Sequence, residues 1–193
     1  MATTRDRLIE AATRLLDEGG PAAVTLREVG RLAGVSHNAP YKHFAGKEDL
    51  LAAVAARELA RPRRPPAAAG PRAAAGSASG AQVLREMMHG YVGWAMRHPA
   101  RFKLTFGAWS AGSDELAEAA GSARAALVAA VRDAQASREV AGGDPERVAA
   151  LILATAHGAV DLALSGHLSE TGKGHARPQD LVDDLLAHLR PAP

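Results

Sequence analysis

Three consecutive polar residues, Ser36, His37 and Asn38, carry hydrogen-bonding groups that can read the edges of DNA bases. An asparagine amide can pair with adenine through two hydrogen bonds, and an imidazole N–H can donate to N7 or O6 of guanine. In the first turn of a helix, Asn38 could also act only as a local cap. We predict that all three residues contact bases, which requires a helix that presents them to the outside.

The flanking residues predict that helix and a partner for it. Thr25 and Glu28 have the spacing of a capping box, which predicts the start of a first helix. Gly34 can take the left-handed conformation that ends a helix, and Ser36 is expected to cap a second helix that reaches about Phe44. Two short helices joined by a glycine turn are typical of the helix-turn-helix, whose second helix enters the major groove of DNA.

Two residues in this pattern depart from simple helix rules. A glycine inside a helix, as Gly30 would be, costs about 1 kcal/mol relative to alanine. With Ser36 as the cap, Pro40 would be the fourth residue of the second helix, and its missing N–H would remove the first intrahelical hydrogen bond. We therefore expect a slightly loosened first turn in the second helix.

The same stretch resembles the DNA-binding domain of the TetR family of bacterial transcriptional regulators. The resemblance is carried by residues 8–12, 15–19, 33–36, 41–44 and 47–51. It implies that Tyr41, His43 and Lys47 hold DNA phosphates, with Thr25 and Arg27 holding the DNA backbone from the first helix of the motif. Lys47 also begins a predicted helix, whose free N–H groups favour phosphate.

A second resemblance lies further along the chain. Residues 98–102, 157–158 and 166–168, with Leu162, resemble the WHG regulatory domain of some TetR-type proteins, named after a Trp-x-x-His-Gly motif. Ala154 stands where that motif has its tryptophan. The family resemblance implies a helical domain that binds a small-molecule effector and forms a homodimer.

The composition favours an all-α fold. Apolar residues make up 47% of the 193 residues, and much of that share is alanine, which favours helices. The sequence contains no run of alternating β-branched residues that would predict a strand. The absence of cysteine excludes disulfides and thiol catalysis and fits the cytoplasm. The polar start predicts no signal peptide, and no apolar run approaches the ~20 residues of a membrane span.

A low-complexity segment divides the chain into two expected domains. Residues 61–80 are rich in Pro, Ala and Gly, with four Arg and no acidic residue, and we predict that they form a flexible linker. Residues 1–60 would form a three-helix helix-turn-helix domain followed by a fourth helix, and residues 81–193 a helical regulatory and dimerisation domain. Periodicity, caps and breakers predict further helices over residues 4–18, 47–61, 81–97, 100–106, 114–139, 145–168 and 178–189.

The second domain carries candidate residues for a ligand pocket and a dimer interface. The pocket candidates are the aromatic, methionine and histidine residues Met87, Met88, Tyr91, Trp94, Phe102, Phe106, Trp109 and His157. Helical spacing of such residues could equally form ordinary core. Apolar stripes on the last two helices are expected to form a four-helix bundle between two chains, through Leu164, Leu168, Leu181 and Leu185. The stripes could instead close the core of one chain.

Patterns for catalysis and metal binding fit poorly. Gly172-Lys173 lacks the flanking residues of a phosphate-binding loop, and Asp161, Ser165 and His167 lie too close along one helix for a convincing triad. His157 and Asp161 have a spacing that suits metal ligation, but no further ligand is fixed by the sequence. We therefore predict no catalytic residue, no metal site and no cofactor.

These observations predict a ligand-responsive transcriptional regulator that acts as a homodimer and is not an enzyme. Its expected partners are a double-stranded DNA operator with palindromic sequence, a small-molecule effector and a second copy of the chain, with no membrane. We favour a repressor, with an activator as one alternative. The other alternative is a helical protein without DNA function that binds a small molecule or acts as an enzyme.

Overall fold

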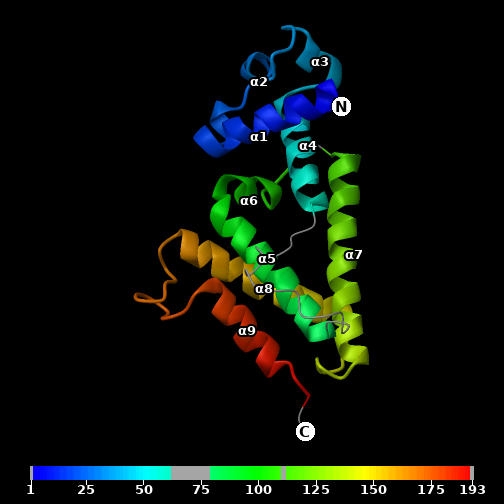
Figure 1. The fold of residues 1–193 in the computed structure, drawn as a ribbon, viewed down its shortest axis with the longest axis vertical. Coiled ribbons are helices and arrows are strands. Elements are labelled where there is room, and N and C mark those ends of the chain that lie inside the picture. The colour runs from blue at the N-terminus through cyan, green and yellow to red at the C-terminus, as the bar shows by residue number, and fades with distance from the viewer. Residues whose placement is uncertain (1, 62–78, 110–111, 192–193) are drawn as a thin grey trace, which may run out of the picture. The chain divides into compact units, whose positions relative to one another are not determined.

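The computed structural model describes residues 2–61, 79–109 and 112–191. Within these ranges the chain is helical, without a β-strand, so the predicted all-α class is confirmed (Figure 1). Most of the predicted linker, residues 62–78, lies outside the described residues. The helices are α1 (Thr4–Ala23), α2 (Leu26–Leu32), α3 (Ala39–His43), α4 (Lys47–Ala60), α5 (Gly80–Arg97), α6 (Pro99–Thr105), α7 (Asp114–Ala136), α8 (Pro145–Leu164) and α9 (Pro178–His188).

The described residues form two compact units that do not follow the order of the chain. The first unit contains α1 to α4, α6 and the beginning of α7. The second contains α5, the remainder of α7, α8 and α9. Residues His98–Ala123 therefore pack with the amino-terminal helices, although they belong to the second of the domains predicted from sequence.

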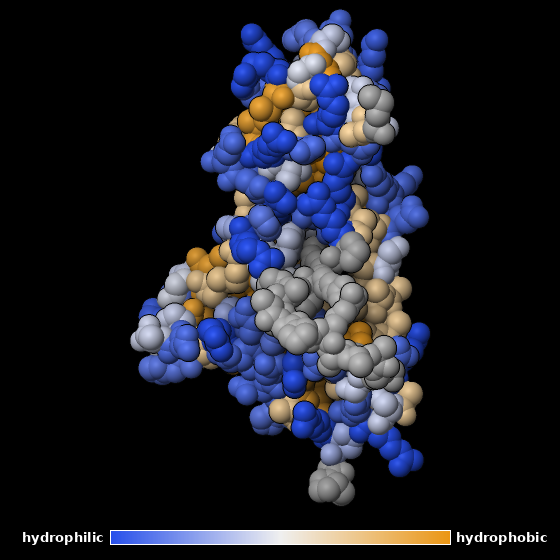
Figure 2. All heavy atoms as spheres, viewed as in Figure 1, coloured by the Kyte–Doolittle hydropathy of each residue, from blue (hydrophilic) through white to orange (hydrophobic). Residues whose placement is uncertain are grey.

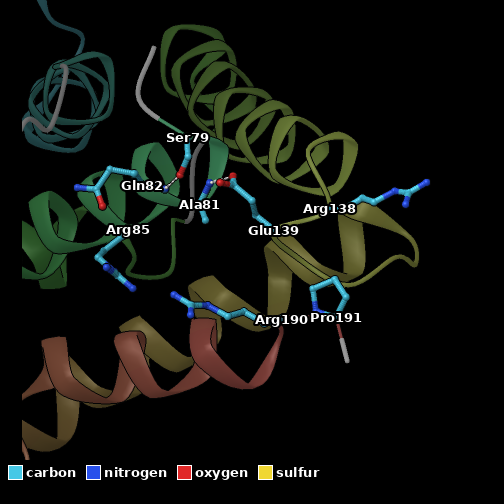
Figure 3. A pocket seen from close by; sticks show the side chains of 8 residues that line it. All are labelled: Ser79, Ala81, Gln82, Arg85, Arg138, Glu139, Arg190 and Pro191. Carbon is cyan, nitrogen blue, oxygen red and sulfur yellow. Dashed lines mark hydrogen bonds between the residues drawn. The ribbon is translucent and has the colours of Figure 1, made fainter. Parts of the chain in front are cut away.

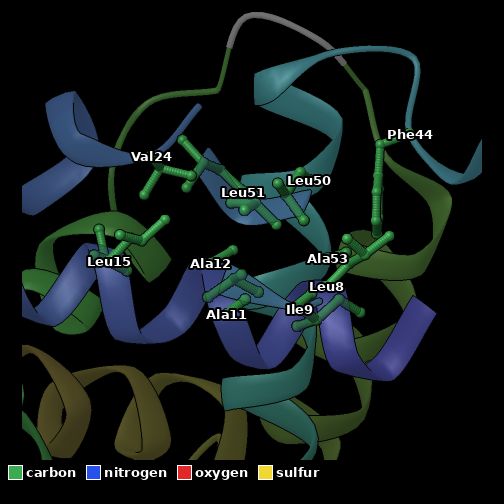
Figure 4. Packing of buried hydrophobic residues seen from close by; sticks show 14 residues of the cluster. Leu8, Ile9, Ala11, Ala12, Leu15, Val24, Phe44, Leu50, Leu51 and Ala53 are labelled. Carbon is green, nitrogen blue, oxygen red and sulfur yellow. The ribbon is translucent and has the colours of Figure 1, made fainter. Parts of the chain in front are cut away.

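The first unit is built on α1. Thr3 and Asp6 form a capping box at its start, and the hydrogen bond from the Thr3 hydroxyl, the largest cause, holds the pKa of Asp6 below its usual range. Non-helical Gly19 and Gly20 interrupt the helix where the sequence predicts its end, and a short turn then continues to Ala23. The buried stripe of α1 packs against residues of α4 and Phe44 in one apolar cluster (Figure 4).

Helix α6 is joined to this unit by an ion network. The Arg101 guanidinium donates to Asp17 of α1 (2.5 Å) and to Glu58 of α4 (3.3 Å), and Glu58 is only 2% exposed. Burial opposes the charge of Arg101, but its bonds to Asp17 and Glu58 keep its pKa above the usual range. The network thus holds α6 against both α1 and α4.

In the second unit, α8 packs against α9 and α5. Asp144 caps α8 and Pro145 occupies its first turn, as the sequence predicts. The predicted extension of this helix to Leu168 is wrong: α8 ends at Leu164, and Leu168 is buried beyond it near Gly174, which has a left-handed φ of 78°. The helix predicted over 114–139 also ends early, at Ala136.

Helix α8 is unusually apolar for a helix that is so exposed to solvent. Among the described helices it alone has the length and composition that could cross a membrane, and 28% of its most apolar 18-residue window is buried. Leu151 and Leu162 are 47% and 46% exposed. Apolar side chains are visible at the surface over the carboxyl end of α8 (Figure 2). The second unit therefore leaves one apolar helix face largely uncovered.

Candidate nucleic-acid interface

The first helix of the motif, α2, has well-defined ends. At its start the Thr25 hydroxyl accepts a hydrogen bond from the Glu28 N–H (3.2 Å), but the Glu28 carboxylate pairs with Arg31. Only half of the predicted capping box is therefore present. At its end Gly34 has a φ of 63°, and Val35 N–H donates to the Gly30 carbonyl (3.1 Å), which completes a Schellman cap.

The second helix of the motif begins later than the sequence predicts. It is α3, Ala39–His43, and Ser36 belongs to the preceding turn, where its carbonyl accepts from the Ala39 N–H (2.9 Å). Pro40 is thus the second residue of the helix, a position at which the N–H has no intrahelical partner to lose. The expected loosening of the first turn is therefore wrong.

Gly30 and Pro40 fit against each other. Pro40 is buried, and a Cβ atom at Gly30 would lie 2.9 Å from Pro40 Cγ. The glycine inside α2 is therefore required by the approach of the proline ring. The two helices of the motif pack more closely than an alanine would permit.

The predicted base-reading residues Ser36, His37 and Asn38 are all exposed. They lie in the turn before α3, and Asn38 makes no side-chain capping bond. The His37 and Tyr41 rings lie with centroids 6.1 Å apart. The turn before α3 therefore presents an exposed polar edge, with the exposed Tyr41 ring of α3 beside it.

The predicted phosphate-binding residues are also all exposed. Tyr41 and His43 are on α3, Tyr41 being 55% exposed, and Lys47 begins α4. Gly46, the N-cap of α4, has no side chain to bond the free N–H groups. Thr25 and Arg27 complete the set at the start of α2. The arrangement offers several hydrogen-bond donors to anionic oxygens.

Two arginines of α1 support the motif, and sequence reasoning missed both. Arg7 Nη2 donates to the Ala33 carbonyl at the end of α2 (2.5 Å). Arg5 lies over the Phe44 ring, 5.4 Å from its centroid, and pairs with Glu115 (2.5 Å). These contacts join residues far apart in sequence, so no local pattern predicts them.

The structure divides the eight predicted pocket residues between the two units. In the second unit, Tyr91 Oη lies 2.9 Å from His157 Nδ1, and the Tyr91 and Trp94 rings are 6.3 Å apart. Met88 is buried there, and Met87 is half-buried. In the first unit, the Phe102 and Phe106 rings are 5.6 Å apart, and Trp109 is half-buried. Thr105 of α6, which sequence reasoning missed, has a buried hydroxyl without a hydrogen-bond partner among the described residues.

One cavity of the second unit, of about 320 Å³, is polar (Figure 3). Arg85 and Arg190 extend toward each other across it, and Glu139 accepts from the Ala81 N–H (2.9 Å) on its wall. That bond is the main cause that lowers the pKa of Glu139. Its lining includes none of the eight predicted pocket residues.

The geometry around α2 and α3 defines a class of protein, the helix-turn-helix DNA-binding proteins. Residues 8–54 match the family model described as "Bacterial regulatory proteins, tetR family", and residues 84–189 match "Tetracyclin repressor-like, C-terminal domain". The chain therefore belongs to the TetR family. It is a DNA-binding transcriptional regulator and not an enzyme.

Individual relatives agree with this assignment. A protein of unknown function from Rhodococcus sp. RHA1 is 30% identical with a TM-score of 0.76, over 98% of this chain and 94% of that one. A putative TetR family regulator from Shewanella sp. PV-4 shares the fold at 19% identity, with a TM-score of 0.64 and 96% of each chain covered. The HTH-type transcriptional repressor Rv3405c from Mycobacterium tuberculosis is 38% identical over 47 residues, 24% of this chain and 25% of that protein. The match spans about a quarter of the length of such curated relatives.

Proposed function

We propose that this regulator is a ligand-responsive repressor that binds a palindromic operator as a homodimer. The observation that carries the proposal is that the predicted donors between the start of α2 and the start of α4 are all exposed. Rv3405c, which is similar to this chain over 47 residues, is itself named a repressor. A regulator of bacterial transcription would act in the cytoplasm, where the chromosome lies.

Within this site we assign two kinds of contact. Ser36, His37 and Asn38 contact base edges, because their short polar side chains stand exposed at the amino end of α3. The surrounding donors hold phosphates and set the register of the protein on the duplex. The phosphate set is Thr25, Arg27, Tyr41, His43 and Lys47.

The dimer is proposed from the uncovered face of α8. A largely exposed apolar helix is unfavourable in water, and a second copy could cover it with its own α8 and α9. Leu164, Leu181 and Leu185 are half-buried and have surface left for a partner. Leu168 is only 7% exposed and therefore has little surface left for a partner. Covering by a second chain also accounts for the composition of α8 without a membrane.

The effector site is proposed around the hydrogen-bonded pair Tyr91 and His157, with Trp94 beside them. We assign DNA binding to residues 1–60 and effector binding and dimerisation to residues 81–193, joined by the segment 61–80. The two reading heads of the dimer would have different separations in different conformations. An effector that binds one conformation more tightly than another would shift the equilibrium between operator-bound and free regulator.

Salt-dependent binding to the DNA upstream of the chain's own gene tests the DNA contacts. Lys47→Ala should weaken binding to all sequences and lower the salt slope by about one per chain. Lys173→Ala, which removes the same charge in the loop before α9, should leave both unchanged. Asn38→Ala should weaken binding to the operator by roughly 1–3 kcal/mol and should leave binding to random DNA unchanged. An equal loss on random DNA would refute its assignment as a base reader.

A reporter gene behind the same DNA separates a repressor from an activator. Deletion of the regulator should raise expression, and Lys47→Ala should do so in part. A fall in expression on deletion would identify an activator and overturn the repressor assignment.

A further inference from the structure

The first unit contains an apolar groove that shares Lys47 with the DNA-reading edge and shares no residue with the proposed effector site. Its volume is about 630 Å³, within the range of ligand pockets. Its lining residues come mainly from α4 and α6, which pack against each other. Figure 1 shows the course of these two helices. The residues that matter for its chemistry are Lys47 and Leu51 of α4, Ala100, Lys103 and Leu104 of α6, and Trp109 beyond it.

The groove combines apolar walls with unpaired positive charge. Leu51, Leu104 and the Trp109 indole supply the walls. Among the residues that the structure describes, neither Lys47 nor Lys103 has a carboxylate partner, although ten arginine–carboxylate pairs are present there. Glu48 also lines the groove, so the lining carries a net charge of about +1 at neutral pH.

Two further features favour an oxygen-bearing ligand. The Trp109 Nε1–H is buried without an acceptor in the described part of the chain, and a buried donor of this kind is costly to leave unsatisfied. Lys47 is also the first residue of the 14-residue helix α4, and its N-cap, Gly46, offers no side-chain acceptor to the free N–H groups, although Glu48 and Asp49 already supply negative charge in the first turn.

We infer that this groove binds a small amphipathic carboxylate, whose apolar body lies between Leu51 and Leu104 and whose carboxylate pairs with Lys47 and Lys103. A singly charged head matches the net charge of the lining. A phosphate ester is a poorer fit, because it carries up to two charges and the groove offers no arginine to hold it.

The inference deepens the proposed function and rests on it in one respect, the role of Lys47 as a phosphate contact. A carboxylate paired with Lys47 competes with a DNA phosphate for the same ammonium group. Ligand and operator then weaken each other's binding by the same factor, as linkage requires. The competition is direct and needs no rearrangement of the second unit.

The intrinsic fluorescence of Trp109 tests ligand binding without DNA. The chain has two tryptophans, so the Trp94→Phe variant reports on Trp109 alone. Octanoate below its micelle concentration should change this fluorescence saturably, and 1-octanol should bind at least tenfold more weakly. In that background, Lys103→Ala should weaken octanoate binding about tenfold, Ala100→Phe should abolish it by filling the groove, and Lys173→Ala should leave it unchanged.

The outcomes separate the groove from the function of Lys47. No saturable signal, equal binding of octanol, or binding that persists in both Lys103→Ala and Ala100→Phe would overturn the site. Circular dichroism checks that Ala100→Phe folds, and the exposed Lys103 provides the test if it does not. Octanoate should also weaken operator binding by the unmodified chain and not by Lys47→Ala. Binding by fluorescence with no effect on the operator would retain the site and overturn the competition.

Discussion

At the scale of single residues, the reading head depends on pairs that only the fold brings together. In the sequence, Gly30 and Pro40 have no evident relation. Gly30 is unfavourable inside a helix, and Pro40 lacks the N–H that a helical hydrogen bond needs. In the structure the proline ring occupies the space next to Gly30 that a methyl group would need. Two residues that are each unfavourable for a helix therefore form one close contact, which holds α3 against α2.

This contact predicts a change of sign in a double-mutant cycle. Gly30→Ala alone should destabilise the protein, because the new methyl group meets Pro40 Cγ at about 2.9 Å. In a Pro40→Ala background the same change should stabilise it, by up to about 1 kcal/mol, because the helix preference of alanine then prevails. Urea unfolding of the four proteins measures both effects. The same sign in both backgrounds would contradict the contact.

At the scale of elements, the sequence predicts helices well and their tertiary supports poorly. Caps and breakers at Asp144, Gly34 and Gly19 mark real ends, since they act through neighbouring backbone groups. The start of α3 was missed because Ser36 can cap a helix or close a turn, and only packing of Pro40 on α2 decides between them. The contacts of Arg7 could not be predicted, because they depend on how distant segments pack.

The network on α6 predicts a large effect for one arginine. Arg101→Met should leave the buried Glu58 paired with Arg61 (3.2 Å), and should destabilise the first unit by roughly 3 kcal/mol. Arg14→Met breaks the exposed pair with Glu10 and should change little. Thermal unfolding compares the two variants. Equal effects would show that burial of Glu58 does not matter.

The cap on α5 predicts a dependence on pH. The Ala81 N–H, followed by the Ser79 hydroxyl, lowers the pKa of Glu139 from its usual 4.5 in the folded state. The stabilisation is therefore complete above 4.5 and is lost as the pH falls through the lowered value. Glu139→Gln should be less stable than the unmodified chain at about pH 7, and the difference should shrink toward about pH 3. A difference independent of pH would refute the charge-based account.

At the scale of the whole molecule, we expect one reading head alone to bind DNA weakly, so that assembly of two chains supplies the rest of the affinity. One head presents a short recognition helix with few side chains that reach bases, whereas a two-fold dimer doubles the contacts on a palindrome. The exposed apolar face of α8 is the surface that the described residues offer for such an assembly. Stability and DNA affinity should then depend on the same interface.

A charge placed on that face should separate the two copies without unfolding them. Leu162 is 46% exposed, so Leu162→Arg introduces little strain within one chain but puts an unpaired charge into the proposed interface, where burial is costly. Sedimentation should show monomers, and operator affinity should fall at least tenfold because each head binds alone. Val83→Arg, on a residue of α5 that is 42% exposed, is the matched control and should remain dimeric. An unmodified chain that sediments as a monomer at micromolar concentration, yet binds a full palindrome tightly, would contradict the assembly.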